Sequence, residues 1–184
     1  MAVGSNVQII SLEEAGIQKE IPEPFDTLRA NAQVKARTIH QLSGYENCFS
    51  EDTGLEVDAL GGEPGVHSAR YAGEPVSYLN NTRKLIRAMA DSSNRRARFV
   101  TVICLILQGL EYFFEGKCEG QILRTITGTG GFGYDSVFMP DGSNKSFAEM
   151  SLTEKNFYSH RRKAADLLIA FLKTQTDPLN HVQN

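Results

Sequence analysis

The stretch FVTVICLIL, from Phe99 to Leu107, decides the fold class. Apart from Thr101, every residue in it is apolar, so an extended chain would present apolar side chains on both of its faces. A strand that is buried on both faces is typical of a sheet with helices on either side. The stretch therefore predicts an α/β fold in which a mixed, twisted central sheet is flanked by helices.

Helical and strand patterns lie on both sides of this stretch. Apolar residues recur at helical spacing from Leu28 to Leu42, just before Gly44, and again from Ala164 to Leu172. Ser77 is a candidate N-cap for a further helix. Other strands are expected at Val7–Leu12, at Cys48–Ser50 and around Gly120–Leu123. We expect one two-lobed domain over residues 1–184, with a polar tail from about residue 174, because no repeat or linker interrupts the pattern.

The composition excludes several classes of protein. The 19 Lys and Arg residues against 22 Asp and Glu give a net charge of −3, which disfavours nucleic-acid binding through bulk positive charge. No apolar run approaches the roughly 20 residues that span a bilayer, and the N-terminus lacks a signal-peptide pattern. Cys48, Cys104 and Cys118 are too widely spaced for a metal motif and are odd in number. We therefore expect a cytoplasmic protein with reduced thiols and no membrane partner.

A glycine-rich loop from Gly128 to Gly133 matches the GxGxxG pattern. A dinucleotide-binding fingerprint must open a helix, whereas Tyr134–Pro140 is typical of extended chain, so that function is disfavoured. A hairpin loop without function is the alternative. The segment Phe132, Gly133, Tyr134 and Asp135 nevertheless combines two aromatic rings, a glycine and a carboxylate. An aromatic ring can stack on a base, and glycine lets the backbone approach a ligand closely.

Adjacent carboxylates, Glu51 and Asp52, follow a short strand pattern. Carboxylate oxygens suit Mg²⁺, which takes one or two of them together with substrate phosphates. Neighbouring residues of a strand point to opposite faces, so both can face one site only if the chain turns, and we expect Thr53-Gly54 to provide that turn. An ordinary acidic turn is the alternative.

Basic residues precede the helix predicted at the C-terminal end. Lys155, His160 and Arg161 lie beside its start, and Ser159 is a candidate N-cap. Their position favours contact with a phosphate or a keto oxygen, because the first N–H groups of a helix also attract anions. A solvated helix face is the alternative for such a basic run.

Six blocks of sequence, in this order, resemble the inosine/xanthosine triphosphate pyrophosphatase family, which hydrolyses non-standard purine nucleoside triphosphates. The blocks are Asn31–Ala36, Glu51–Leu60, Pro64–Gly73, Gly128–Asp135, Phe147–Met150, and Glu154-Lys155 with Ser159–Arg161. An ordered set is far more specific than any single block.

The resemblance implies roles for the candidate residues. Asp52 would be the general base and a Mg²⁺ ligand, Glu51 would occupy the neighbouring acidic position at the metal, and Thr53 would touch substrate. The residues that would hold the nucleotide are Phe132, Gly133, Tyr134, Asp135, Lys155, His160 and Arg161. Water would attack the α-phosphorus of dITP, ITP or XTP and release pyrophosphate and the monophosphate. A homodimer is also implied.

Two departures from the family pattern give an alternative. The family's first strand and its Thr-Asn-Asn-x-x-Lys-type loop have no counterpart before Val7–Leu12. Arg29-Ala30 stand where the family is expected to carry an acidic metal ligand, so one Mg²⁺ ligand is predicted to be missing. The alternative is a degenerate nucleotide-binding protein with weak or no catalysis.

Overall fold

A computed structural model describes residues 8–44 and 47–175 and contains a sheet of order β2-β1-β3-β4-β5. The strands are β1 (Cys48–Val57), β2 (Pro64–Gly65), β3 (Arg96–Leu107), β4 (Leu110–Ile122) and β5 (Phe138–Pro140). Every pairing between the described strands is antiparallel, so the sheet is antiparallel there rather than mixed. One cause is local. Gln108-Gly109, both with positive φ, join β3 to β4 in a tight hairpin, a connection that only antiparallel strands can use.

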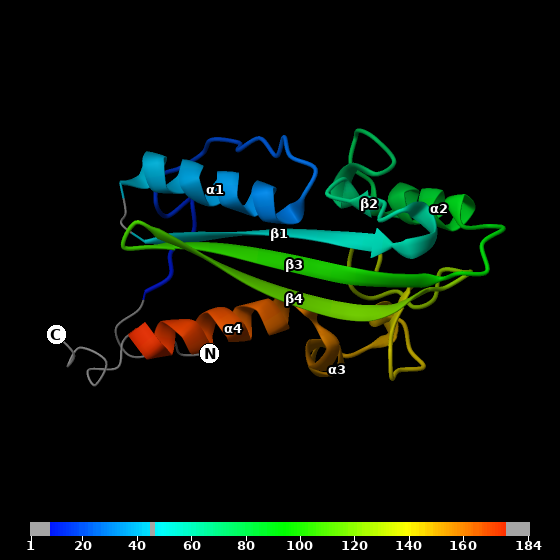
Figure 1. Cartoon of the computed structure of the whole chain (residues 1–184). Coiled ribbons are helices and arrows are strands. Elements are labelled where there is room, and N and C mark those ends of the chain that lie inside the picture. The colour runs from blue at the N-terminus through cyan, green and yellow to red at the C-terminus, as the bar shows by residue number, and fades with distance from the viewer. Residues whose placement is uncertain (1–7, 45–46, 176–184) are drawn as a thin grey trace.

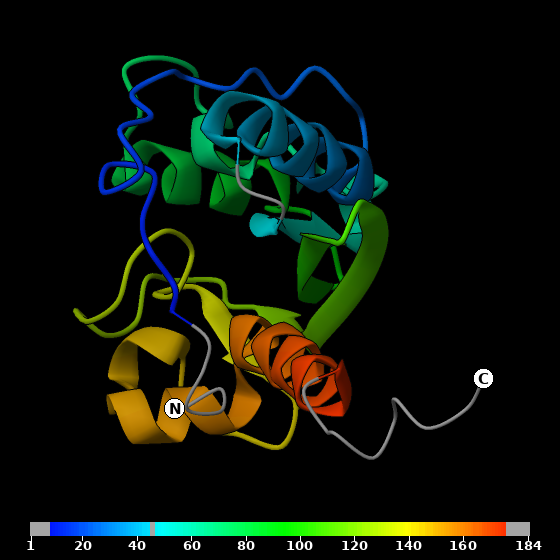
Figure 2. The ribbon, with the colours of Figure 1, turned by 90° about the vertical axis from the view of Figure 1, so that its left-hand side faces the viewer.

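Helices cover both faces of this sheet, which confirms the predicted α/β fold (Figure 1). The α-helices are α1 (Leu28–Ser43), α2 (Tyr78–Ala88), α3 (Leu152–Tyr158) and α4 (His160–Gln175), and the short 3₁₀ turns are η1 (Asp58–Leu60), η2 (Ser68–Arg70) and η3 (Phe147–Glu149). Figure 2 shows α1 and α4 on opposite sides of the long strands. Within the described residues, no helix combines the length and the apolarity needed to span a bilayer.

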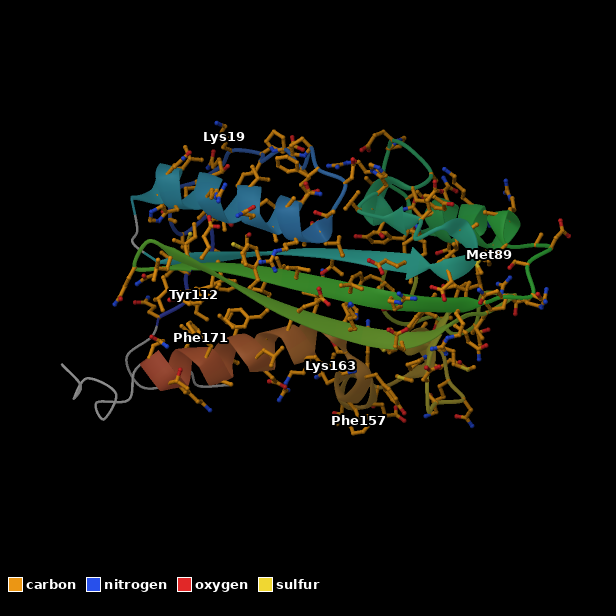
Figure 3. All side chains as sticks on the ribbon, in the orientation of Figure 1. Lys19, Met89, Tyr112, Phe157, Lys163 and Phe171 are labelled. Carbon is orange, nitrogen blue, oxygen red and sulfur yellow. The ribbon has the colours of Figure 1, made fainter. Side chains whose placement is uncertain are left out.

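Strand β3 is central and buried on both faces, as its sequence predicts. Val100, Val102 and Cys104 pack toward α1, whereas Ile103 and Leu105 pack toward α4. Burying each such side chain contributes about 1.5–3 kcal/mol. On the α4 side, the rings of Tyr112 and Phe171 also pack together, with centroids 4.5 Å apart (Figure 3).

The predicted helix caps are confirmed. Helix α1 ends at Gly44, whose φ of 67° is left-handed. Ser77 caps α2 by accepting from the backbone N–H of Asn80. Arg162 donates its backbone N–H to Ser159 Oγ at 3.2 Å, so Ser159 caps the start of α4. Each such cap contributes about 1 kcal/mol.

Two local predictions are wrong. The described part of Val7–Leu12 forms no strand, and Ile9 and Ile10 are exposed; a β-branched run needs a partner to become a strand. Thr53-Gly54 forms no turn, because β1 stays paired with β3 through both residues. The strand expected around Gly120–Leu123 is longer and begins at Leu110. Most of the predicted polar tail lies outside the described residues.

Candidate functional site

Strand β1 separates the two candidate carboxylates. Asp52 faces α1, where its Oδ1 accepts from Lys35 Nζ at 2.7 Å. Glu51 faces α4, where its Oε1 lies 2.9 Å from Arg161 Nε. Successive residues of an extended strand point to opposite faces, and the turn that would bring them together is absent. The structure therefore does not bring Glu51 and Asp52 together around one metal ion.

A second carboxylate does lie near Asp52, and it belongs to Glu23. Lys35 Nζ is 2.6 Å from Glu23 Oε1 as well as 2.7 Å from Asp52 Oδ1. The segment that carries Glu23 is fixed to α1 by Asn31, whose side-chain amide bonds both the N–H and the carbonyl of Phe25 at 3.0 Å. We call Glu23, Lys35 and Asp52 the acidic cluster. An open hollow of about 450 Å³ borders it at Glu23.

Sequence reasoning missed Glu23 and placed the expected carboxylate at Ala30 instead. The side chain of Arg29 is occupied elsewhere, with its guanidinium 3.6 Å from the centroid of the Phe113 ring. The only signal for Glu23 is its position between Pro22 and Pro24, which restrict the backbone before the helix. A carboxylate thus lies near Asp52 although Arg29 and Ala30 carry none. In the described chain, however, no three His, Cys, Asp or Glu side chains converge as a ready metal site.

The surroundings of Asp52 suit a base. Its residue surface is only 9% exposed, and this burial raises the pKa of the carboxyl, while the hydrogen bond and charge of Lys35 act in the opposite direction. A carboxylate with a raised pKa accepts a proton from water more readily. Asp52 therefore combines a fixed position with increased basicity.

A second group lies on the α4 side of β1, around an exposed aromatic ring. Phe132 is 54% exposed, and Lys155 Nζ and Arg161 Cζ lie 4.8 and 5.5 Å from its ring centroid. Asp135 holds this group together: its Oδ2 lies 2.5 Å from Lys155 Nζ and accepts the Phe132 N–H at 2.8 Å. We call Phe132, Asp135, Lys155 and Arg161 the aromatic cluster. Its ring and cations are arranged to bind a planar, electron-rich ligand.

Gly131 makes the tight approach of Asp135 possible. Its φ is +72°, and a Cβ there would overlap Asp135 Oδ2. A side chain at this position would therefore be strained and would displace the carboxylate. The glycine-rich loop opens no helix, as predicted, but residues 134–137 form turns and only Phe138–Pro140 are extended.

The remaining predicted nucleotide contacts are more deeply placed. His160 is 7% exposed and stacks on Phe99 with centroids 4.7 Å apart. Burial, together with the positive charges of Arg161 and Lys155, lowers the pKa of His160 to about 3, so its imidazole is neutral at pH 7. Its Nδ1 is buried without a hydrogen-bond partner in the described chain.

Tyr134 is buried, unlike Phe132. It is 4% exposed, and its hydroxyl donates to the carbonyl of Ser68 at 2.9 Å. Burial also raises its pKa. The carbonyl of neighbouring Gly133 accepts from Thr82 Oγ1 at 3.3 Å. These two residues anchor the loop to α2 and η2, whereas Phe132 projects from it.

The two clusters lie on opposite faces of β1. Thr53 shares the face of Glu51, and its hydroxyl lies 2.7 Å from that of Thr101. On the side away from β3, β1 pairs with β2 only at Leu55 and Glu56, so in the described chain no strand covers its edge from residue 48 to 54. A ligand lying across this edge can touch both faces of the strand.

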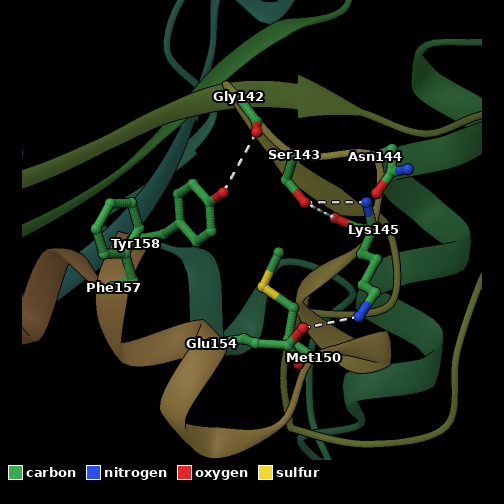
Figure 4. Close-up of a pocket in the computed structure, with 8 residues that line it drawn as sticks. All are labelled: Gly142, Ser143, Asn144, Lys145, Met150, Glu154, Phe157 and Tyr158. Atoms are coloured by element: carbon green, nitrogen blue, oxygen red, sulfur yellow. Dashed lines mark hydrogen bonds and ion pairs between the residues drawn. The ribbon is translucent and has the colours of Figure 1, made fainter.

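Another hollow, of about 650 Å³, lies beside α3 (Figure 4). Lys145 and Glu154 pair across it at 2.7 Å, and the Tyr158 hydroxyl donates to the Gly142 carbonyl at 3.3 Å. It contains none of the predicted site residues. The candidate chemistry therefore lies at the edge of β1 and not in this hollow.

Comparisons with known proteins find relatives that are about half identical to this chain. The dITP/XTP pyrophosphatase of Flavobacterium johnsoniae is 49% identical over 167 residues, which cover 91% of this chain and 86% of that protein. The dITP/XTP pyrophosphatase of Porphyromonas gingivalis is 51% identical, over 90% and 86% of the two chains.

Solved structures give the same answer for the fold. The Ham1 protein of Staphylococcus aureus has a TM-score of 0.89 and 35% identity, with 95% of this chain and 91% of that one covered. The HAM1 protein of Coxiella burnetii has a TM-score of 0.88 and 33% identity, over 93% and 88% of the chains. The family model described as the Ham1 family matches residues 1–171. The resemblance seen in the sequence is confirmed, and the chain belongs to the Ham1 family.

Proposed function

We propose that this chain hydrolyses dITP, ITP and XTP to the nucleoside monophosphate and pyrophosphate. The observation that carries this proposal is the placement of a buried carboxylate cluster and an exposed aromatic cluster on either side of one open strand edge. A nucleoside triphosphate has a planar base at one end and a polyanion at the other, which matches the two clusters. The names of relatives that are about half identical support the same substrates.

The acidic cluster fits Mg²⁺. Glu23 and Asp52 offer hard oxygen donors that already converge on one positive charge, the Lys35 ammonium group. These two carboxylates would hold the ion, with substrate phosphates completing its coordination. When bound, Mg²⁺ would offset the negative charge that develops on the phosphoryl oxygens.

Asp52 is the residue that we assign to proton transfer. Its pKa is raised by burial, and it would accept a proton from the water that attacks the α-phosphorus. Lys35 contacts the same carboxylate and supplies a cation that can neutralise a phosphate oxygen. Lys155, which Asp135 holds beside Phe132, supplies another cation on the opposite face.

The aromatic cluster would hold the base. Phe132 offers the face of its ring, and Arg161 offers N–H donors to the 6-keto oxygen of hypoxanthine or xanthine. His160 is neutral and carries one donor and one acceptor. Adenine presents an amino group at position 6, so a site built from donors would reject it. We also propose a cytoplasmic homodimer, as the family resemblance implies.

The position of Glu23 weakens the alternative of a nucleotide-binding protein without catalysis. That alternative depended in part on a missing carboxylate, and a carboxylate is present beside Asp52. No observation in the described residues favours it.

Release of pyrophosphate from ITP with Mg²⁺ tests the proposal. We expect the wild-type chain to be active and Asp52→Asn to lower kcat by about 10²–10⁴-fold, the range for loss of a general base. Glu23→Gln should raise the Mg²⁺ concentration needed for half-maximal rate. Glu20→Gln, an exposed carboxylate in the same segment, is the matched control. Wild-type release no greater than that of Asp52→Asn would contradict the proposal.

A further inference from the structure

Glu51 has a partner that gives it a role away from the metal. Its side chain faces α4, and its Oε1 lies 2.9 Å from Arg161 Nε. The acidic cluster lies on the other face of β1, where Asp52 contacts Lys35. Glu51 can therefore influence the ligand that Arg161 contacts, and it lies away from the acidic cluster.

Arg161 has five N–H donors, and it contacts Glu51 as an ion pair in which Nε lies 2.9 Å from Oε1. Its two terminal amino groups carry the other four, and within the described part of the chain Arg161 forms no ion pair besides the one with Glu51. The guanidinium carbon lies 5.5 Å from the centroid of the exposed Phe132 ring. Glu51 thus fixes one edge of the guanidinium and leaves the other edge available beside the ring.

The ion pair is placed for positioning more than for stability. The side chains of Arg161 and Glu51 are 43% and 41% exposed, and ion pairs at such exposure stabilise a fold little because water screens them. The backbones of both residues are fixed, that of Glu51 by the pairing of β1 with β3 and that of Arg161 by α4, whereas both side chains have several rotatable bonds. The ion pair therefore limits the positions that the guanidinium can adopt.

We propose that Glu51 is a positioning residue that acts through Arg161: it holds the guanidinium beside Phe132 so that its terminal amino groups face the keto oxygen of the base. This inference rests on the proposed function, and it replaces the metal role suggested for Glu51 by the resemblance. Glu51 would then affect which base is accepted, and it would do so without Mg²⁺.

A double-mutant cycle on nucleotide binding tests this. Binding of inosine monophosphate and adenosine monophosphate is measured by calorimetry in EDTA for wild type, Glu51→Gln, Arg161→Ala and the double variant. We expect Glu51→Gln to weaken binding of inosine monophosphate about tenfold, the loss of one charge-assisted contact, and to leave adenosine monophosphate unchanged. In the Arg161→Ala background the same change should have no further effect.

A matched control separates positioning of Arg161 from a general loss of negative charge on β1. Glu56→Gln removes another exposed carboxylate of β1, one that lies 3.8 Å from Arg98, and should leave both affinities unchanged. An equal loss from Glu51→Gln with and without Arg161 would overturn the inference, as would unchanged affinity together with a higher Mg²⁺ requirement in ITP turnover. A wild-type chain that turns over no ITP would overturn the proposed function itself, whereas normal turnover with an unchanged preference in Glu51→Gln overturns only the role of Glu51.

Discussion

Each face of β1 carries an ion pair between an acidic and a basic side chain, and the two pairs differ in their exposure to solvent. On the α1 face, Lys35 and Asp52 form an ion pair whose side chains are 16% and 11% exposed. On the α4 face, Glu51 and Arg161 form one whose side chains are 41% and 43% exposed. Desolvated charges depend strongly on their partners, whereas exposed charges can exchange partners at little cost. The comparison associates fixed chemistry with the buried face and adaptable recognition with the exposed one.

Removing Lys35 should have the largest effect, because it would leave Glu23 and Asp52 facing each other without a cation. We expect Lys35→Ala to cost about 3 kcal/mol of unfolding free energy, at the low end for breaking a buried pair, and to raise the pKa of Asp52 further. Urea unfolding measures this loss, and Lys19→Ala is a surface control. If Lys35→Ala lost no more unfolding free energy than Lys19→Ala, the acidic cluster would be solvated. The two faces of β1 would then not differ in the burial of their ion pairs.

The pH dependence of the free energy of unfolding tests whether water reaches His160 on the α4 side of the sheet. Burial lowers the pKa of His160 from an ordinary 6.5 to about 3. Between these values the unfolded chain binds more protons than the folded one, so the contribution is complete above pH 6.5 and is lost as the pH falls toward 3. We expect about 2 kcal/mol to be lost between pH 6.5 and 5.

The His160→Gln variant should remove this part of the pH dependence in urea unfolding at pH 5 and 7, whereas His67→Gln should retain it. If His160→Gln lost as much unfolding free energy between pH 7 and 5 as the wild type, water would reach the imidazole of His160.

Loss of the exposed ring should affect binding with little effect on the fold. Phe132→Ala removes a ring that is 54% exposed, and stacking of a base on such a ring is associated with about 1–3 kcal/mol. We expect KM for ITP to rise about tenfold with stability nearly unchanged. Phe157→Ala, which removes an 80% exposed ring on α3, is the matched control and should not change KM. An equal rise in KM in Phe132→Ala and Phe157→Ala would show that Phe132 does not contact the base.

The sequence predicted much of the fold but not this contrast, and the errors have a common cause. The doubly buried stretch at Phe99–Leu107 and the caps at Gly44 and Ser159 depend on local pattern, and they are confirmed. Whether Thr53-Gly54 turns depends on pairing with β3, which lies about 50 residues away in sequence.

Glu23 shows the same limit for the site. It reaches Asp52 only because Asn31 fastens the preceding segment to α1 through the backbone of Phe25. Motif matching located Asp52, Phe132 and Arg161 as separate blocks, but the turn expected at Thr53-Gly54 would have brought Glu51 and Asp52 to one face, and that turn is absent. That division between two faces is a property of the extended backbone, and it separates the acidic cluster from the aromatic cluster.

The smallest expected effect concerns how the loop shapes the exposed face. Gly131→Ala and Gly142→Ala both place a side chain at positive φ, which costs about 1 kcal/mol in either case. Only at Gly131 does the new Cβ meet an atom, Asp135 Oδ2, whereas nothing lies within 4 Å at Gly142. Gly131→Ala should therefore raise KM for ITP several-fold by displacing Asp135 from Lys155, and Gly142→Ala should lose stability alone. If both variants lost stability equally and kept the wild-type KM, the carboxylate of Asp135 would not be what orders the cations around Phe132.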